Sequence, residues 1–555
     1  MEKLNTDQMT FTAVKHLPIV KQYARRINLV ETINQLVGSQ MDLSPGMAIL
    51  AMVLDTISGR TPLYRLTEFF EEKDTELLLG TAIEPDLFCD TNLGRAMDKI
   101  FETGTLKIFS QLSQNAISVF DVDARRVHFD TASVSVYGDY DLADPPFQIT
   151  CGHSKDKRPD LKQFLISMLC VDSNIPILGA TQDGNASDKT LNNELLTNIS
   201  KHMARYGLAP GAYVYVADSA LVTPDNLDKA DSSPKTWFLT RLPAAYNECS
   251  RVISQAVQAD DWIDIGPLAE EPSCPKRPAA HYKAYEGTVE LYDKTYRAVV
   301  VHSSAHDKRR HKRIDRLLKQ DRKQLEQACR QATATAFFCH ADAKAAGEKL
   351  INTATSGYRR ITVDIEKVPK YSRGRPAKDK PRTALRYEYM LTANIIEAPK
   401  KVDPLKPQAG CFVLPASLIG RQEDWPAPEL LKLYKSQIGV EKNFSFLKDP
   451  AVVNSIFLKK AERIEALGLI LLISLLIWRL MERSMRRYVE INDYTLTGRE
   501  RRPTKKPTSY MMTTKFAGIL VITTGKNRQL ARPLKDFQRE YLQAMGVTEE
   551  VFTVP

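Results

Sequence analysis

The chain has 555 residues, of which 43% are hydrophobic and 26% are charged, and its formal net charge at pH 7 is +10. This length exceeds one simple core, so we expect two to four domains in a well-packed globular protein. The positive balance favours a polyanionic partner, and the eight scattered cysteines contain no Cys-x2-Cys pair, which argues against a thiolate zinc site.

Residues 1–115 are predicted to be mainly helical. Ser44-Pro45 is a helix-start signal before the apolar run at 47–54. The segment has 11 Lys and Arg against 15 Asp and Glu, a balance of −4. We therefore do not expect it to be the only part of the chain that binds a polyanion.

Residues 116–243 contain two predicted strands that carry aspartates. The segment 127–137 is rich in β-branched and aromatic residues, which predicts a strand with Asp130 in its middle. The segment 213–218 predicts a short buried strand that ends in Asp218. A carboxylate at the end of a buried strand commonly faces the crevice where open α/β sheets bind ligands. The alternative for each aspartate is a residue that begins a turn.

Residues 244–425 are predicted to be an insertion, because the chain between Asp218 and Glu441 is far longer than one crossover helix needs. Residues 287–301 predict two strands joined by a turn at Asp293-Lys294. Residues 307–347 predict a charged helix or helical hairpin with an apolar side formed by Ile314, Leu317, Leu318 and Leu325.

Two stretches of this insertion are strongly basic. Residues 307–323 have nine Lys and Arg against three Asp and Glu. Arg373 and Arg375 belong to an Arg-Gly-Arg-Pro stretch that resembles the core of an AT-hook, which can enter a narrow minor groove. An ordinary basic loop between strands is the alternative for that stretch.

Four polar residues share one face of a single helix predicted between Pro428 and Asp449: Tyr434, Gln437, Glu441 and Lys448. Their offsets of three, seven and fourteen residues return them to within roughly 60° of one another around a helix. Such a stripe could face a metal ion and a phosphodiester backbone. The alternative is an amphipathic helix with an exposed Glu and Lys, and Gly439 disfavours a continuous helix.

The last part of the chain combines a very apolar segment with a basic one. Residues 466–478 are too few to cross a bilayer, so we expect a buried core helix beside the Glu441 helix and no membrane partner. Residues 491–555 carry 11 Lys and Arg against 6 Asp and Glu. No export signal is evident in residues 1–20, and reduced cysteines point to the cytoplasm.

These segments resemble the DDE transposases of bacterial insertion sequences, in the cut-and-paste group with a Tyr-x2-Arg-x3-Glu-x6-Lys signature. Tyr434, Glu441 and Lys448 match the signature at its spacing, whereas Gln437 stands where the family usually has Arg. The resemblance extends to the surroundings of the two aspartates and covers residues 15–490; the further matching stretches are 129–131, 152–164 and 217–220.

The resemblance implies an α/β fold with a ribonuclease H-like mixed-sheet catalytic core, a large α+β insertion and a helical N-terminal domain. Its parts would be 1–115, a helical domain that can bind DNA ends; 116–243, the first half of the core; 244–425, the insertion of strands and a charged helical hairpin; 426–490, the second half of the core; and 491–555, a basic C-terminal region.

It also implies that Asp130, Asp218 and Glu441 are the catalytic residues and the metal ligands. Three converging carboxylates need cations to offset their repulsion, and hard oxygen ligands favour two Mg²⁺ ions, with Mn²⁺ as a substitute. Two such metal ions support in-line displacement at phosphorus. The expected activity is cleavage at element ends followed by strand transfer, and no general-base side chain is required.

The partners implied are double-stranded DNA, as terminal inverted repeats and as target, and a second copy of the chain on that DNA. The location implied is the cytoplasm of a bacterium, in association with the nucleoid. Trp262 and Trp425 are candidates for stacking on a flipped base, with a core tryptophan as the alternative for each. The expected DNA-binding residues are Tyr434, Gln437, Lys448, Lys155, Lys157, Arg158, Arg373 and Arg375.

Two other functions remain open from the sequence. Gln437 would suit a catalytically inactive DNA-binding protein derived from a transposase, although the three acids argue against it. A ribonuclease H-like DNA nuclease that cleaves without strand transfer is the second alternative, and the long insertion and the near-complete signature disfavour it.

Overall fold

A computed structural model describes residues 9–59, 61–140, 145–153, 158–209, 211–232, 236–269, 278–305, 307–354, 356–374, 382–418, 425–448 and 458–555. The chain divides into two compact units. The core unit comprises Met1–Thr240 and Lys432–Pro555, and the inserted unit comprises Arg241–Leu431. The inserted unit therefore interrupts the core unit in the sequence and contains the whole of residues 244–425.

The N-terminal segment of the core unit is mainly helical, as predicted. Ser44 caps α3, its Oγ accepting a hydrogen bond from the Met47 amide at 3.4 Å, and Pro45 occupies the first turn. Gly59 ends the same helix with a positive φ of 118°. The helices are α1 (Leu17–Arg26), α2 (Leu29–Val37), α3 (Pro45–Ser58), α4 (Leu66–Glu71), α5 (Thr75–Leu79), α6 (Asp90–Thr103) and α7 (Thr105–Phe120).

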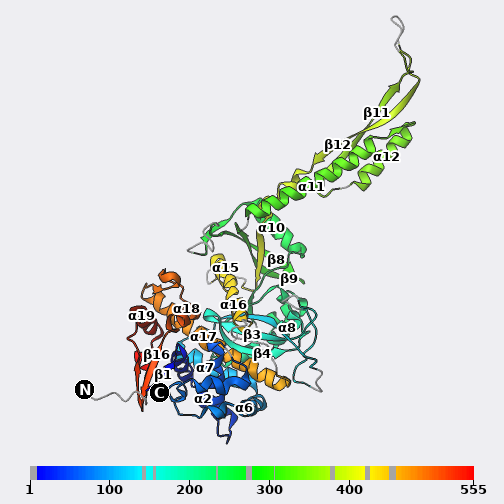
Figure 1. The fold of residues 1–555 in the computed structure, drawn as a ribbon. Coiled ribbons are helices and arrows are strands. Elements are labelled where there is room, and N and C mark those ends of the chain that lie inside the picture. Colours follow the sequence, from blue (N-terminus) through cyan, green and yellow to red (C-terminus); the bar gives the residue numbers. More distant parts are fainter. Residues whose placement is uncertain are drawn as a thin grey trace. The chain divides into compact units, whose positions relative to one another are not determined.

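A mixed sheet follows these helices in the core unit (Figure 1). Its strands lie in the order β4-β3-β2-β5-β6, with β3 antiparallel to both of its neighbours and β5 parallel to both of its neighbours. The two predicted strands are present as β2 and β5. The bounds are β2 (Arg126–Val136), β3 (Lys162–Val171), β4 (Ile175–Gln182), β5 (Val214–Val216) and β6 (Trp237–Leu239).

Helices flank this sheet, as expected for the α/β class. Helix α8 (Asp188–Ala204) contacts β2, and the Tyr215 hydroxyl of β5 donates to Asn192 Oδ1 of α8 at 2.5 Å. Helix α9 (Pro224–Asp231) joins β5 to β6. Helices α15 (Ala427–Ser436) and α16 (Ile438–Leu447) return from the inserted unit, and α16 packs against β2.

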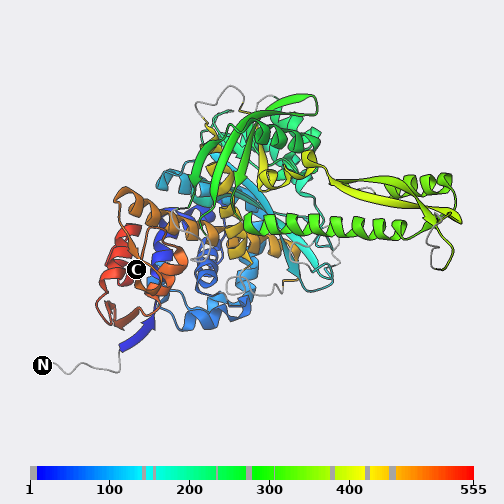
Figure 2. The ribbon, with the colours of Figure 1, turned by 90° about the horizontal axis from the view of Figure 1, so that it is seen from above.

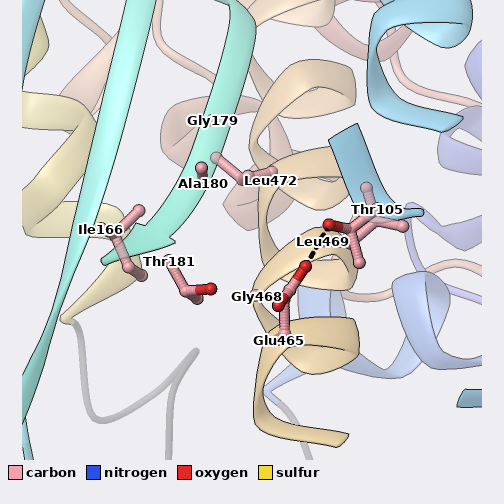
Figure 3. Close-up of a pocket in the computed structure, with 9 residues that line it drawn as sticks. All are labelled: Thr105, Ile166, Gly179, Ala180, Thr181, Glu465, Gly468, Leu469 and Leu472. Atoms are coloured by element: carbon pink, nitrogen blue, oxygen red, sulfur yellow. Dashed lines mark hydrogen bonds between the residues drawn. The ribbon is translucent and has the colours of Figure 1, made fainter. Parts of the chain in front are cut away.

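Helix α17 (Ala461–Ile491) is the central helix of the core unit and contacts α3, α6, α7, α16 and β4. Within the described residues it is the one helix long and apolar enough to cross a membrane, and 89% of its most apolar window is buried inside the protein. Its approach to β4 is close, because a Cβ at Gly179 would lie 2.5 Å from Leu472 (Figure 3). The prediction of a buried core helix at 466–478 is confirmed.

The C-terminal segment joins the N-terminal strand. Strand β1 (Met9–Ala13) pairs antiparallel with β16 (Leu520–Thr524), which pairs with β17 (Asn527–Leu530), and Figure 1 shows β1 beside β16. The Tyr23 hydroxyl donates to the Met545 carbonyl at 3.2 Å. Residues 1–115 and 491–555, predicted as separate parts, therefore share a sheet. The other C-terminal elements are β14 (Leu496–Thr497), β15 (Pro503–Thr504), α18 (Ser509–Phe516) and α19 (Asp536–Met545).

The inserted unit begins with an antiparallel sheet in the order β13-β9-β8-β7. The predicted hairpin at 287–301 is present, and its turn is at Tyr292-Asp293, one residue before the predicted position. Both turn residues have positive φ, at 51° and 61°, which matches the twist of the strands. The elements are α10 (Asn247–Ala259), β7 (Ile263–Pro267), β8 (His281–Leu291), β9 (Lys294–Ser303) and β13 (Cys411–Ala416).

The charged segment of the inserted unit is a helical hairpin packed on a long strand pair. Helix α11 (Asp307–Thr333) and α12 (His340–Thr353) contact the hairpin of β11 (Arg359–Lys370) and β12 (Arg386–Glu397) (Figure 2). Leu325, Cys329, Leu350 and Ile361 form their shared core. Leu317, predicted on the apolar side of α11, is 41% exposed. The remaining elements are β10 (Ala336–Phe337), α13 (Pro399–Val402) and α14 (Leu405–Gln408).

Candidate active site

Asp130 lies in the middle of β2, where its Cα partner on β3 is Met168. The side chain is half-buried, and its Oδ1 accepts a hydrogen bond from the Thr131 amide at 2.8 Å. A strand places successive side chains on opposite faces, so Asp130 shares a face with His128. The prediction of an aspartate in the middle of a strand is confirmed.

Asp218 follows the end of β5 and caps a short 3-10 turn, Ser219–Leu221. Its Oδ1 accepts from the Ala220 amide at 3.0 Å, and its carbonyl oxygen accepts from Thr240 Oγ1 at 2.6 Å. Asp218 therefore does begin a turn, as the simpler alternative held. That role does not exclude a site, because the turn fixes a half-buried carboxylate at the carboxyl end of a parallel strand.

The strand register aligns the two aspartates. Strands β2 and β5 are parallel, and His128 is the partner of Val216. Asp130 lies two residues beyond His128 within β2, and Asp218 lies two residues beyond Val216, just after β5 ends. Neighbouring strands lie about 4.8 Å apart. The two aspartates, from segments far apart in the sequence, therefore follow the last register pair of two neighbouring parallel strands at the same offset.

The electrostatics of Tyr215 agree with this placement. Burial raises the pKa of the Tyr215 phenol well above its usual value, and the negative charges of Asp218 and Asp130 raise it further. Both carboxylates must lie close enough to the phenol for their charges to act on it.

Glu441 lies on α16, which is anchored beside β2 by a buried polar network. Asn443 is fully buried, and its Nδ2 donates to the Asn174 carbonyl at 2.8 Å. Arg479 of α17 donates from Nε to Asn443 Oδ1 at 2.6 Å. The Glu441 side chain itself is exposed. The helix is thus fixed against the Asp130 strand while its carboxylate points away from the protein interior.

The chain just before Glu441 departs from the single helix that the sequence predicted. Helix α15 ends at Ser436 and α16 begins at Ile438, although Gln437 between them keeps helical backbone angles. The next helix, α16, lies tightly against the turn that precedes β4. A Cβ on Gly439 would lie only 1.9–2.1 Å from Asn174 side-chain atoms. The glycine that disfavoured a continuous helix is therefore required for this close packing.

His128 connects the end of α15 to β2. Its Nε2 lies 3.1 Å from Ser436 Oγ, and Ser436 donates its own proton to the Leu433 carbonyl at 2.6 Å. Burial, followed by the charge of Arg126, lowers the pKa of His128 to about 4, so the ring is neutral at pH 7.

The structure gathers two of the three predicted acids. Across the described parts of the chain, no three His, Cys, Asp or Glu side chains lie together as a group that could hold a metal ion. Asp130 and Asp218 are aligned, whereas Glu441 is on an adjacent helix with its side chain exposed. The donors are carboxylate oxygens, which fit Mg²⁺ by type.

The expected DNA-binding residues have varied settings. Tyr434, Gln437 and Lys448 are half-buried. Arg158 pairs with Asp160 at 2.7 Å, and Arg373 is exposed just after β11. Three further candidates lie outside the described residues: Lys155, Lys157 and Arg375.

The two candidate tryptophans belong to the inserted unit and are half-buried. The Trp262 ring centroid lies 6.3 Å from the rings of both Tyr285 and His302. The Trp425 carbonyl accepts from Arg297 at 2.7 Å. For Trp262, this edge-on ring packing favours a structural role.

Sequence reasoning missed Asn443 and Arg479, the pair that holds the Glu441 helix in place. A signal was present, since Asn443 falls at helical spacing from Val440 and Leu447, which are both buried. A cavity between β4 and α17 also lay outside the prediction (Figure 3). It contains the hydrogen bond from Thr105 to Glu465, at 2.6 Å, and none of the predicted site residues.

Comparison with known proteins gives three results. Residues 9–114 match a family described as Domain of unknown function (DUF4277), which covers β1, helices α1–α6 and the first part of α7. No curated protein matches the chain. Among solved structures, the chain is similar to the piggyBac transposase in a synaptic complex with hairpin DNA, determined by cryo-EM. The TM-score is 0.36 and the identity 10%, over 96% of this chain and 83% of that one. Similarity this low establishes neither fold nor function.

Proposed function

We propose that this protein is a DNA transposase of the DDE type, which cleaves DNA at the ends of a mobile element and joins the freed ends to target DNA. The observation that carries the proposal is that Asp130 in β2 and Asp218 just after β5 lie at the same offset from the last register pair of these parallel strands, while α16, which bears Glu441, packs against β2. The signature spacing of Tyr434, Glu441 and Lys448 supports it.

The three acids act together in this proposal. Asp130 and Asp218 present a pair of like charges whose repulsion is relieved when cations bind. Glu441 completes the ligand set when DNA and metal are present, since its exposed side chain is able to change rotamer. Two Mg²⁺ ions, when bound, would activate the attacking oxygen and stabilise the leaving oxygen at phosphorus.

The surrounding residues hold the DNA backbone near these acids. Lys448, just after the end of α16, contributes a positive charge, and Tyr434 of α15 contributes a hydroxyl donor. Gln437 has a neutral amide where the family has the charged guanidinium of Arg, so its contact with phosphate is weaker than that of the family residue. Cleavage uses water as nucleophile, and strand transfer uses the released 3′-hydroxyl.

The test is an assay with linear DNA that carries candidate terminal repeats, a target plasmid, and either Mg²⁺ or Ca²⁺. We expect cleaved and joined products with Mg²⁺ and binding without cleavage with Ca²⁺. Glu441→Gln and Asp218→Asn should each reduce both steps by roughly 1,000-fold and leave DNA binding largely intact. The matched control is Asp225→Asn, an exposed acid on α9, which should cleave at the normal rate.

A second candidate function is DNA binding without catalysis. It is favoured by the missing three-acid group within the described residues and by Gln437. The same assay decides, because this candidate predicts bound but uncut DNA with either ion. Cleavage without joined products would instead indicate a nuclease. Normal cleavage by Glu441→Gln would remove Glu441 from the site.

A further inference from the structure

Helix α11 has one face buried against its own unit. Leu325 and Cys329 are 5% and 7% exposed and pack with Leu350 of α12 and Ile361 of β11. Because this face packs in the shared core, the rotation of α11 about its own axis is fixed. The opposite face of α11 is therefore directed away from the hairpin of β11 and β12.

That opposite face carries a continuous stripe of cations. At about 100° per residue, six exposed Lys and Arg side chains fall within a sector of about 120°, centred opposite Leu325 and Cys329. They extend along about 21 Å of the helix. We call these six residues the α11 stripe: Arg309, Lys312, Arg313, Arg316, Lys319 and Lys323.

The four acids of α11 are all engaged elsewhere. Asp307 pairs with Arg310 at 3.5 Å, and Glu326 pairs with Arg322 at 2.9 Å. Asp315 pairs with Lys406 at 2.8 Å, and Asp321 pairs with Arg359 at 2.7 Å. Among the described residues, no member of the α11 stripe has an ion-pair partner. The stripe is therefore a concentration of positive charge that nothing in the described fold neutralises.

The first part of the stripe also has a defined shape. Side chains from about two and a half turns line a single surface depression, and all of its lining residues are cationic: Lys308, Arg309, Arg310, Lys312, Arg313 and Arg316. A depression whose lining residues are all cationic suits an anionic ligand that runs along the helix.

We propose that the α11 stripe binds the sugar–phosphate backbone of duplex DNA without reading its sequence. The choice of DNA rests on the proposed function, whereas the stripe itself rests on the charge and geometry of α11. Long exposed cations neutralise phosphates and release counterions, which gives an affinity that falls steeply with salt. Base edges play no part, so the binding is equal for all sequences.

The experiment compares two triple variants of the full chain that change the net charge equally. Arg309→Gln, Arg313→Gln and Arg316→Gln remove half of the stripe. Arg251→Gln, Arg322→Gln and Lys406→Gln remove three exposed cations of the same unit that are paired with Glu248, Glu326 and Asp315. Binding of a labelled 30-base-pair duplex of arbitrary sequence is measured by fluorescence anisotropy across a salt series, in Ca²⁺. Circular dichroism checks that both variants fold.

We expect the stripe variant to bind roughly 100-fold more weakly at 0.1 M salt, with a salt slope that is smaller by about 3, on two unrelated sequences alike. The paired variant should stay within a few-fold of the unmodified protein. Equal losses for both variants, or an unchanged slope for the stripe variant, would overturn the proposal. Tight, stripe-dependent binding of polyglutamate with no binding of DNA would also overturn it, in favour of an acidic protein partner.

Failure here is distinguishable from failure of the proposed function. The unmodified protein could cleave and join DNA while the stripe variant binds DNA with the same affinity as the unmodified protein. In that case the proposed transposase function holds, and the α11 stripe is not its DNA-binding surface. If the unmodified protein binds DNA through the stripe but never cleaves, the stripe stands and the catalytic proposal fails.

Discussion

Two basic regions of this chain use their cations differently. The α11 stripe is exposed, and the acids of helix α11 pair with cations outside the stripe. In residues 491–555, Arg528 is only 7% exposed and pairs with Asp74 at 2.6 Å and Glu76 at 2.7 Å, on the acidic N-terminal segment. Arg528 of the C-terminal region therefore helps to hold the fold together, whereas the cations of the α11 stripe face solvent.

The difference shows why net charge alone is a poor guide to a nucleic-acid surface. The acidic balance of residues 1–115 and the basic balance of 491–555 are partly complementary, because the two segments share the sheet of β1 and β16. A cation that is buried and paired stabilises, and one that is exposed and unpaired is available to a ligand.

The largest expected effect comes from breaking the buried pair. Arg528→Gln leaves Asp74 with its negative charge in a largely buried site, so we expect the free energy of unfolding to fall by about 4 kcal/mol. Its hydrogen bonds with Asp74 hold the pKa of Arg528 above its usual value, so this cation stays charged. Chemical denaturation measures the loss. DNA affinity of the folded variant should not change, and a loss of affinity would break the comparison.

The next effect concerns the second buried cation, Arg479, and its partner. Asn443→Ala removes the hydrogen bonds to Arg479 and to the Asn174 carbonyl, so we expect a loss of about 3 kcal/mol in the free energy of unfolding. Cleavage should slow as α16 loosens beside β2. The matched control is Ser445→Ala on the exposed side of the same helix, which should change stability by less than about 0.5 kcal/mol. Equal effects of the two variants would contradict this role.

Mild acid should lower the stability of the core unit and leave the charge of the α11 stripe unchanged, without any mutation. Burial lowers the pKa of His16 to about 4, despite its Nε2 contact with the Ile57 carbonyl at 3.4 Å. The unfolded chain, with a His pKa near 6.5, binds more protons between pH 4 and 6.5, so stability is full above pH 6.5 and is lost as pH falls. We expect the core unit to lose about 2 kcal/mol between pH 7.5 and 5 from this group.

Denaturation at the two pH values measures the total loss, and His16→Gln should reduce it by about 2 kcal/mol. His128, whose pKa is also about 4, keeps a loss of similar size in that variant. The Lys and Arg of the α11 stripe keep their charge throughout, so DNA affinity of the folded protein should not fall over the same range. A pH dependence unchanged by His16→Gln would show that other groups carry it.

The smallest effect is expected at the end of β11. Arg373→Gln should weaken binding to A·T-rich duplex DNA by about 1 kcal/mol and leave binding to G·C-rich duplex DNA nearly unchanged, because a narrow minor groove favours Arg. Anisotropy with two matched duplexes measures the difference. Lys505→Gln is the control, since Lys505 pairs with Asp493 in the C-terminal region. Equal losses on both duplexes would indicate a phosphate contact in place of minor-groove recognition.

The sequence by itself determined the local elements, since a few neighbouring residues decide each of them. Ser44-Pro45 started α3, the apolar run at 466–478 formed the buried middle of α17, and the β-branched segments around Asp130 and Asp218 became strands. Apolar residues at helical spacing within a highly charged segment also indicated the helical hairpin of the inserted unit. Each of these signals acts within a few turns or strand residues.

Only the tertiary structure decided how distant segments meet. It aligned Asp130 with Asp218 through the β2–β5 register, required Gly439 to make room for Asn174, and paired Arg528 with Asp74. It also separated the cations that serve the fold from those of the α11 stripe. The physical reason is that register, close packing and ion pairing depend on residues far apart in the sequence, whose partners no local pattern identifies.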